Sequence, residues 1–162
     1  MAVVDFFLKI EGIDGESQDS KHKGEIDIES WSWGETQGGS HGVGGGGGAG
    51  KVQMHDLSIV KRIDKSSPKL LLACANGEHI KKAVLVARKA GKDQQEYFKM
   101  TLSDLLVSSF QTSGHGGSDV HPTDQVTLNF AKIEVAYKEQ KADGTLGGEL
   151  KAGWDVKANK AV

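Results

Sequence analysis

The segment "EIDIESWSW", residues 25–33, decides the fold because its apolar side chains change face halfway along it. In a β-strand, Ile26 and Ile28 would lie on one face, and Trp31 and Trp33 would lie on the other. A regular strand cannot direct both pairs into one core. Either a bulge falls near residues 29–30, or both faces of the strand are covered.

Six further segments alternate apolar and polar residues as strands do, and several of them also change face. They are residues 3–10, 51–63, 83–90, 96–112, 124–140 and 153–157. Many strands separated by glycine-rich turns indicate a closed barrel or a sandwich. The repeated changes of face favour a curved, bulged antiparallel β-barrel, so the fold is predicted to be mainly β.

One segment, "SSPKLLLACANGEHI" at residues 66–80, has the start and stop signals of a helix. Ser67 can cap the first turn, Pro68 suits the first helical position, and Gly77 suits the position after the last turn. We predict a short α-helix at about residues 68–76. Its leucines are expected to pack on the barrel, with Leu71 in the core.

The size and charge of the chain exclude several classes of function. The chain has 162 residues, which suits a single domain spanning residues 1–162. Its formal net charge is −2, which argues against a nucleic-acid binder that relies on a basic surface. We expect neither a signal peptide nor a membrane-spanning helix, since no window approaches ~20 apolar residues. The single cysteine, Cys74, excludes an intramolecular disulfide and favours folding in a reducing compartment.

The stretch "GGSHGVGGGGGAGK", residues 38–51, has the outline of a phosphate-binding loop in Gly45, Gly50 and Lys51. A working loop of that kind continues with Ser or Thr and opens a helix. Here Val52 follows, and the next residues alternate as a strand. Nucleotide binding is therefore not expected.

The same glycines indicate assembly instead. Ordering residues 38–50 would cost on the order of 10–25 kcal/mol of backbone entropy, which so few apolar side chains cannot offset. We expect a long glycine-rich extended loop at about residues 36–51 that orders against a neighbouring chain.

No pattern of reactive side chains points to an enzyme or a metal centre. None of the six histidines has the spacing of a metal site, and we interpret them as solvated loop residues. Cys74 lies among leucines, and no nucleophile elbow is present. We therefore expect no catalytic residue, no cofactor and no metal. Trp31, Trp33 and Trp154 are interpreted as core residues; the alternative is a stand-alone β-barrel carbohydrate-binding module that uses one of them.

Four segments together resemble one known family. They are "GESQDSKHKGEIDIESWSWG" (15–34), "GGGGGAGKVQMHDLSIVKRIDKSSPKLLLACANGEHI" (44–80), "VTLNFAKIEVAY" (126–137) and "QKADG" (140–144). They cover most of the chain and resemble the Hcp (hemolysin-coregulated protein) family of bacterial type VI secretion systems. The resemblance implies a β-barrel subunit that forms hexameric rings around a wide channel. It further implies that rings stack into a tube like that of contractile phage tails and can carry effectors in the channel.

The resemblance also implies partners and a location. The partners are other copies of the chain, in a homo-hexamer and in stacked rings, and also effector proteins, a spike protein and a contractile sheath. Neither nucleic acid nor membrane insertion is implied. The tube would assemble in the bacterial cytoplasm and be secreted without a signal peptide.

Individual roles follow from the resemblance and from strand alternation. The loop at 36–51 corresponds to one that reaches an adjacent ring, and its stacking residues would be Val43, Gly44, Gly46, Gly48 and Lys51. Ser30 and Ser32 face away from the neighbouring tryptophans and are assigned to the channel lining, where small hydrophilic side chains let cargo pass. The predicted core residues are Trp31, Trp33, Leu71, Phe130 and Trp154. Strand edges at 3–10 and 126–137 are assigned to the lateral contact.

Overall fold

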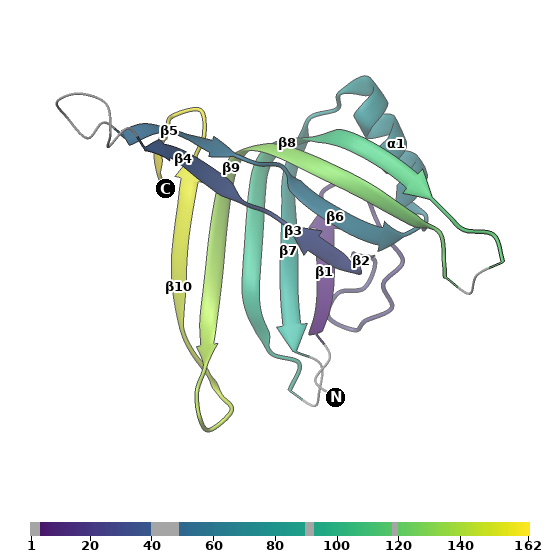
Figure 1. Ribbon diagram of the computed structural model, residues 1–162. Helices are drawn as coiled ribbons and strands as arrows, with labels where there is room; N and C mark the ends of the chain where they lie inside the picture. The colour runs from purple at the N-terminus through teal and green to yellow at the C-terminus, as the bar shows by residue number, and fades with distance from the viewer. Residues whose placement is uncertain (1–3, 40–48, 90–92, 118–119) are drawn as a thin grey trace.

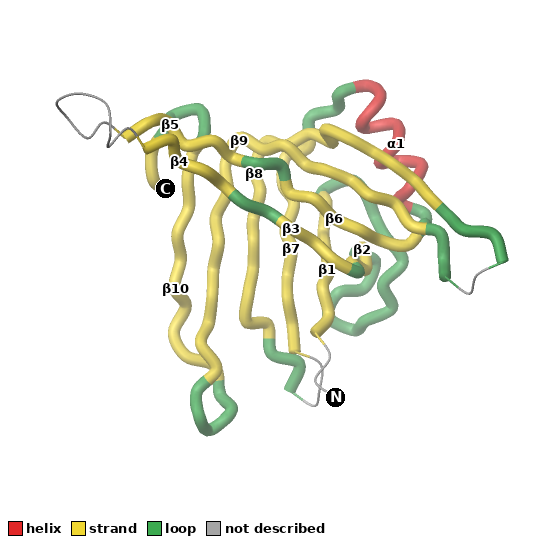
Figure 2. Tube along the Cα trace, in the orientation of Figure 1, coloured by secondary structure: helices red, strands yellow, loops and turns green. Residues whose placement is uncertain are grey.

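The computed structural model describes residues 4–39, 49–89, 93–117 and 120–162 (Figure 1). The elements are β1 (Val4–Ile10), β2 (Ile26–Ile28), β3 (Ser30–Ser32), β4 (Glu35–Gly39), β5 (Ala49–Met54), β6 (Leu57–Arg62), α1 (Ser66–Asn76), β7 (Ile80–Lys89), β8 (Glu96–Ser113), β9 (Thr123–Gln140), β10 (Leu146–Asp155) and β11 (Lys160–Ala161). Strands dominate these residues (Figure 2), so the prediction of a mainly β, antiparallel fold with one helix is confirmed. The described helix is neither long nor apolar enough to cross a membrane.

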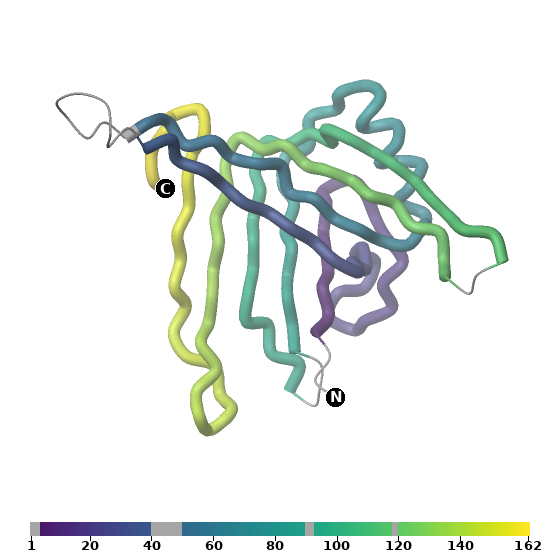
Figure 3. Tube along the Cα trace, viewed as in Figure 1, coloured from purple at the N-terminus to yellow at the C-terminus, as the bar shows by residue number. Residues whose placement is uncertain are grey.

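Two long, bent strands divide the sheet into two layers. The main layer has the strand order β11-β10-β9-β8-β7-β1-β2, and all its pairings are antiparallel. Strands β8 and β9, of 18 residues each, continue beyond it and turn across it (Figure 3). There, residues 107–113 of β8 and 123–128 of β9 join β6 and β3 in a second layer, here called the crossing layer.

The change of face in residues 25–33 produces a break in the strand at Glu29. Before it, β2 pairs with β1 in the main layer; after it, β3 pairs with β6 in the crossing layer. The Glu29 amide donates to the Val60 carbonyl at 2.9 Å, which ties the bend to β6. The irregularity predicted near residues 29–30 is therefore confirmed. It lets both apolar pairs reach one core, with Ile26 buried on one side of the break and Trp31 packed against the core on the other.

The barrel is not closed by a continuous ladder of hydrogen-bonded strands. On one side, the β2–β3 segment carries the chain from one layer to the other. On the opposite side, β4 and β5 form a separate two-stranded ribbon, and no pairing among the described residues joins that ribbon to β10. The two layers therefore diverge there.

The core lies between the two layers. Its largest fully buried apolar side chains are Leu8, Ile10, Ile26, Leu57, Ile59, Leu70, Leu85, Met100, Leu102, Leu105 and Leu128. Phe130 is also buried, as predicted. Trp31 is half-buried, stacks on Phe98 at 5.5 Å between ring centroids, and meets the edge of Phe6 at 6.0 Å.

The helix begins two residues earlier than predicted and ends at the predicted residue. Gly77 adopts the left-handed conformation (φ 66°) after the last turn. The prediction that Leu71 lies in the core is wrong, because its side chain is 54% exposed while that of Leu70 is fully buried. Residues three or four apart share a helix face, so Leu70 lies with buried Ser67 and Ala73, and Leu71 is turned away from β8.

The two ends of the predicted extended loop at 36–51 pair with each other and form a two-stranded β-ribbon. Strands β4 and β5 pair in antiparallel fashion, with Gln37 opposite Val52, which satisfies backbone groups that an extended loop would leave open. Lys51 is exposed in β5. The other proposed stacking residues, Val43, Gly44, Gly46 and Gly48, lie outside the described residues.

Candidate functional site

The outer surface of the crossing layer is lined by small polar side chains and is here called the polar face. The pairing of β3, β6, β9 and β8 places hydroxyl groups from all four strands in one row across it. The row is Ser32, Ser58, Thr127 and Ser109, and the next row is Ser30, Val60, Gln125 and Gln111. Because side chains alternate, the row between them, which contains Trp31, Ile59 and Val126, faces the core.

Hydrogen bonds fix part of the polar face. The Ser108 hydroxyl donates to Asp56 Oδ2 at 2.6 Å and lies 2.7 Å from the Thr127 hydroxyl. The Asn129 amide donates to Asp56 Oδ1 at 2.8 Å. The Asp56 carboxylate is thus engaged on both oxygens. The polar face is therefore a preformed surface of small hydrophilic groups.

The two predicted channel residues lie together on this polar face, where Ser30 and Ser32 are exposed. Sequence reasoning missed Ser58, Ser109 and Thr127, which continue the row. Alternation within each strand gives their orientation, but only the pairing of strands from distant parts of the chain brings them into line.

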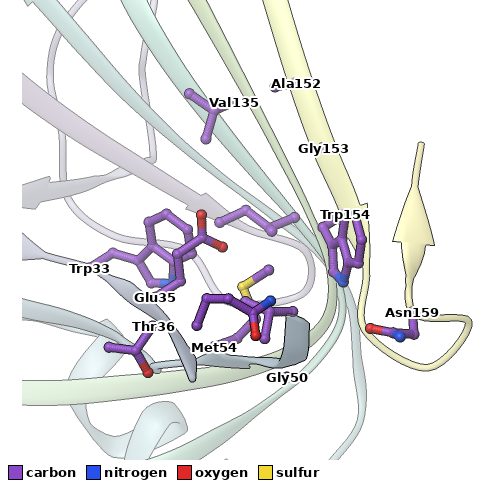
Figure 4. A pocket seen from close by; sticks show the side chains of 13 residues that line it. Trp33, Glu35, Thr36, Gly50, Met54, Val135, Ala152, Gly153, Trp154 and Asn159 are labelled. Atoms are coloured by element: carbon purple, nitrogen blue, oxygen red, sulfur yellow. The ribbon is translucent and has the colours of Figure 1, made fainter. Parts of the chain in front are cut away.

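A second feature is an open cleft where the two layers diverge. It has a volume of about 860 Å³ and lies between the β4–β5 ribbon and strands β9 and β10 (Figure 4). Its apolar lining includes Trp33, Val52, Met54, Ile133, Val135 and Trp154. Trp33 and Trp154 come from opposite walls (Figure 4). Both tryptophans pack against the core while also lining the cleft, so they are only partly buried.

A buried ion pair anchors the helix to the two layers. The Lys61 side chain is completely buried and donates to Asp124 at 2.8 Å, to Asp64 at 2.9 Å and to Ser67 at 3.0 Å. Burial alone would raise the pKa of Asp124, but hydrogen bonds from Lys61 and Ser67, together with the Lys61 charge, hold it below its usual range. The Lys61 ammonium thus donates to two carboxylates and to the Ser67 hydroxyl, which ties the start of α1 to β6 and β9.

A second charged cluster holds the loop between β1 and β2 against β7 and β8. Arg88 is buried and donates to Asp19 at 2.6 and 2.9 Å. Its hydrogen bond lowers the pKa of Asp19 far below the usual range. The His22 ring lies between Glu25, at 2.9 Å, and Glu96, at 2.7 Å. The interpretation of His22 as a solvated loop residue is therefore wrong, because its ring is enclosed by this cluster.

Within the described part of the chain, no three His, Cys, Asp or Glu side chains are grouped so that they could hold a metal ion. Two surfaces stand out, the polar face and the open cleft. Both are extended, and both carry few charged side chains. Such surfaces are suited to contact with macromolecules.

Comparison with known proteins agrees with the fold and places the chain in a family. The family described as "Type VI secretion system effector, Hcp" matches residues 7–137. Protein hcp1 of Pseudomonas aeruginosa is 52% identical over 158 residues, which cover 96% of this chain and 97% of that protein. The crystal structure of Hcp1 from Salmonella typhimurium is similar with a TM-score of 0.81 at 40% identity, covering 100% of both chains. The solved structure of another type six secretion system protein is similar with a TM-score of 0.94 at 27% identity, covering 99% of this chain and 100% of that chain.

Proposed function

The chain belongs to the Hcp family of type VI secretion proteins, and from this premise we propose that it is a structural subunit of the secretion tube. Six copies form a ring, rings stack into the tube, and effector proteins travel in the central channel. The assembled tube works with a spike protein and a contractile sheath, and it is secreted after assembly in the bacterial cytoplasm.

The polar face is the observation that carries this proposal. A channel that passes different cargo proteins needs a wall of small hydrophilic groups without apolar patches that would trap them. The two rows on four adjacent strands consist of hydroxyl and amide side chains except for Val60, so no apolar patch forms, and Ser32 lies in the hydroxyl row.

Unpaired strand edges support a ring. In the described residues, β3 pairs only with β6, and residues 107–113 of β8 pair only with β9, so the crossing layer has an open edge on each side. Unpaired edges favour pairing with another chain, and edges of two different kinds generate a ring if the rotation closes. The edges assigned from the sequence, at 3–10 and 126–137, do not fit, because β1 and β9 are already paired on both sides.

The alternative of a carbohydrate-binding module is less well supported. Sugar hydroxyls need convergent polar partners, whereas the lining of the cleft is mainly apolar. The Trp33 indole N–H already donates to the His55 carbonyl at 2.9 Å, and the Trp154 indole nitrogen is buried.

Size and cargo retention test the proposal. The purified protein should elute near six times its chain mass of 17.3 kDa, with rings visible by electron microscopy. Elution as a monomer or dimer would contradict the proposal. Ser32→Gln should leave rings intact but change the retention of a co-expressed effector, because the exposed hydroxyl row gains bulk. Unchanged export of every effector by that variant would remove Ser32 from the channel lining.

The assignment of ring stacking to residues 36–51 is part of the proposal. Deleting residues 43–48 should leave the ring intact but prevent rings from stacking. Normal stacking and secretion by the deletion variant would show that the segment has no part in the axial contact.

A further inference from the structure

The His22 ring ties the loop between β1 and β2 to strand β8. Its Nδ1 atom lies 2.9 Å from Glu25 Oε2 in the same loop, and its Nε2 atom lies 2.7 Å from Glu96 Oε1 in β8. An ionised carboxylate can only accept a hydrogen bond, so each contact needs a proton on the ring nitrogen. An imidazolium carries both protons, whereas a neutral imidazole carries only one. These three side chains are here called the His22 latch.

The His22 latch is enclosed by groups from several elements. The Phe7 ring of β1 stacks on the His22 ring, with 4.3 Å between centroids and 8° between planes. The guanidinium of Arg88 in β7 lies over the same Phe7 ring, 4.8 Å from its centroid. Within the loop, Asp19 accepts a hydrogen bond from the His22 amide at 3.2 Å. The His22 side chain is only 8% exposed, so water does not readily replace a hydrogen bond that the ring loses.

A second tie joins the same loop to β7, and this tie does not change near neutral pH. Arg88 donates to Asp19 at 2.6 and 2.9 Å and to Asp5 of β1 at 3.3 Å. Its hydrogen bond lowers the pKa of Asp19 far below the usual range, and the bond to Asp19 raises the pKa of Arg88. Both groups therefore stay charged. A histidine, by contrast, is the side chain whose charge changes most readily between about pH 5 and 8.

We propose that the His22 latch is a pH-sensitive device that clamps the loop to β8 while the ring carries both protons and releases β8 when one proton leaves for solvent. Glu25 keeps the remaining N–H, because it lies in the same loop and its side chain is 15% exposed, against 39% for Glu96. The bare Nε2 atom then faces Glu96 with an acceptor on each side and no proton between them. The two atoms separate, since Glu96 can be hydrated and the ring cannot donate to it.

Release of β8 loosens the cover on an apolar side chain outside the core. Phe7 points away from the core, because its neighbour Leu8 points into it. It is nevertheless only 4% exposed, and His22 lies against its ring. The order of the loop is therefore greatest in mildly acidic solution and is lost as the pH rises, while Arg88 keeps the loop attached to β7. The His22 latch lies within one subunit and does not depend on assembly.

Hydrogen exchange at several pH values tests the His22 latch in the full-length protein. The Gly15, Ser17 and Gly24 amides all donate to carbonyls within the loop, so they report on its order. After correction for intrinsic exchange rates, their protection should fall about ten-fold or more from pH 6 to pH 9, as expected for the loss of one hydrogen bond to a charged group. The amides of β9 should keep their protection. Size-exclusion chromatography at each pH shows whether assembly changes over the same range.

Glu96→Gln distinguishes the His22 latch from a general effect of packing. The glutamine amide can donate to the bare Nε2 atom while Nδ1–H donates to Glu25, so the neutral ring is fully bonded. Protection of the loop in this variant should no longer fall as the pH rises. His22→Gln should also lose the pH dependence, with weaker protection than the wild type at pH 6. The control, His79→Gln, changes an exposed histidine and should behave like the wild type.

Three results would each overturn the proposal. In the first, protection of the wild-type loop changes with pH no more than that of β9. In the second, His22→Gln keeps the pH dependence of the wild type. In the third, Glu96→Gln loses protection with rising pH as the wild type does, and this variant decides the matter even if His22→Gln fails to fold. None of these results bears on the ring or the tube of the proposed function.

Discussion

The buried Lys61 ion pair gives the most direct test of what holds the helix to the layers. In Lys61→Met, the Asp124 carboxylate, whose side chain is 1% exposed, loses its cation and stays buried. Removing one partner of such a pair costs about 3–5 kcal/mol. With a urea slope of about 2 kcal/mol/M, the unfolding midpoint should fall by about 1.5–2.5 M at pH 7.

The stability that Lys61→Met loses should depend on pH, and the protonation of Asp124 fixes the direction of that dependence. In the wild type, the lowered pKa of Asp124 contributes stability above its unfolded value of about 3.9, and that stability is lost as pH falls through the folded value. In Lys61→Met, burial without the cation raises the pKa of Asp124, so protonation at low pH relieves the penalty. The difference between the two proteins should therefore shrink from pH 7 to pH 4.

Urea unfolding followed by circular dichroism, at one protein concentration, measures these differences, since assembly adds stability by mass action. Replacing the exposed Lys81 by Met is the control and should change the midpoint little. Adding Asp124→Leu to Lys61→Met should recover part of the loss, because an apolar pair replaces the buried charge. A loss below about 1 kcal/mol at pH 7, or an equal loss at both pH values, would refute this account of the pair.

Two other substitutions test the packing. Leu70→Ala should destabilise the subunit by about 2–5 kcal/mol, whereas Leu71→Ala should cost well under about 1 kcal/mol, because only Leu70 is buried. Thermal unfolding measures both losses. Equal losses would contradict the orientation of α1. In Gly15→Ala, the new Cβ would lie 2.5 Å from the Glu25 carbonyl oxygen. The loop between β1 and β2 should therefore loosen and exchange its amide hydrogens faster. Unchanged hydrogen exchange would argue against this close approach.

The sequence predicted the parts of the fold that depend on local patterns. The change of face in residues 25–33 predicted the break found at Glu29, and the signals at Pro68 and Gly77 predicted the helix. The phase of the helix was not predictable, since three consecutive leucines mark no particular face. Residues 51–54 of β5 lay within the predicted strand at 51–63, but β4 was missed, because its residues are all polar or glycine and show no alternation.

The candidate surfaces were harder to predict because they depend on contacts between distant segments. Ser32 could be placed on the solvent face from its neighbours, but its row with Ser58 and Thr127 requires the register of three strands. The cleft exists because β10 and the ribbon do not pair, and a missing pairing leaves no local pattern. Trp33 and Trp154 therefore could be recognised as apolar, but not as the walls of an opening.

The incomplete barrel connects the fold with assembly. A barrel that functions alone removes its strand edges by closure, and it covers its apolar interior. Here the crossing layer keeps two open edges, and Leu150 exposes an apolar side chain from the core-facing side of β10. Both features cost solubility in an isolated subunit, and both are covered if neighbouring copies supply the missing strands and side chains. The parts of the fold that are unfavourable in one subunit are therefore the parts expected to contact another.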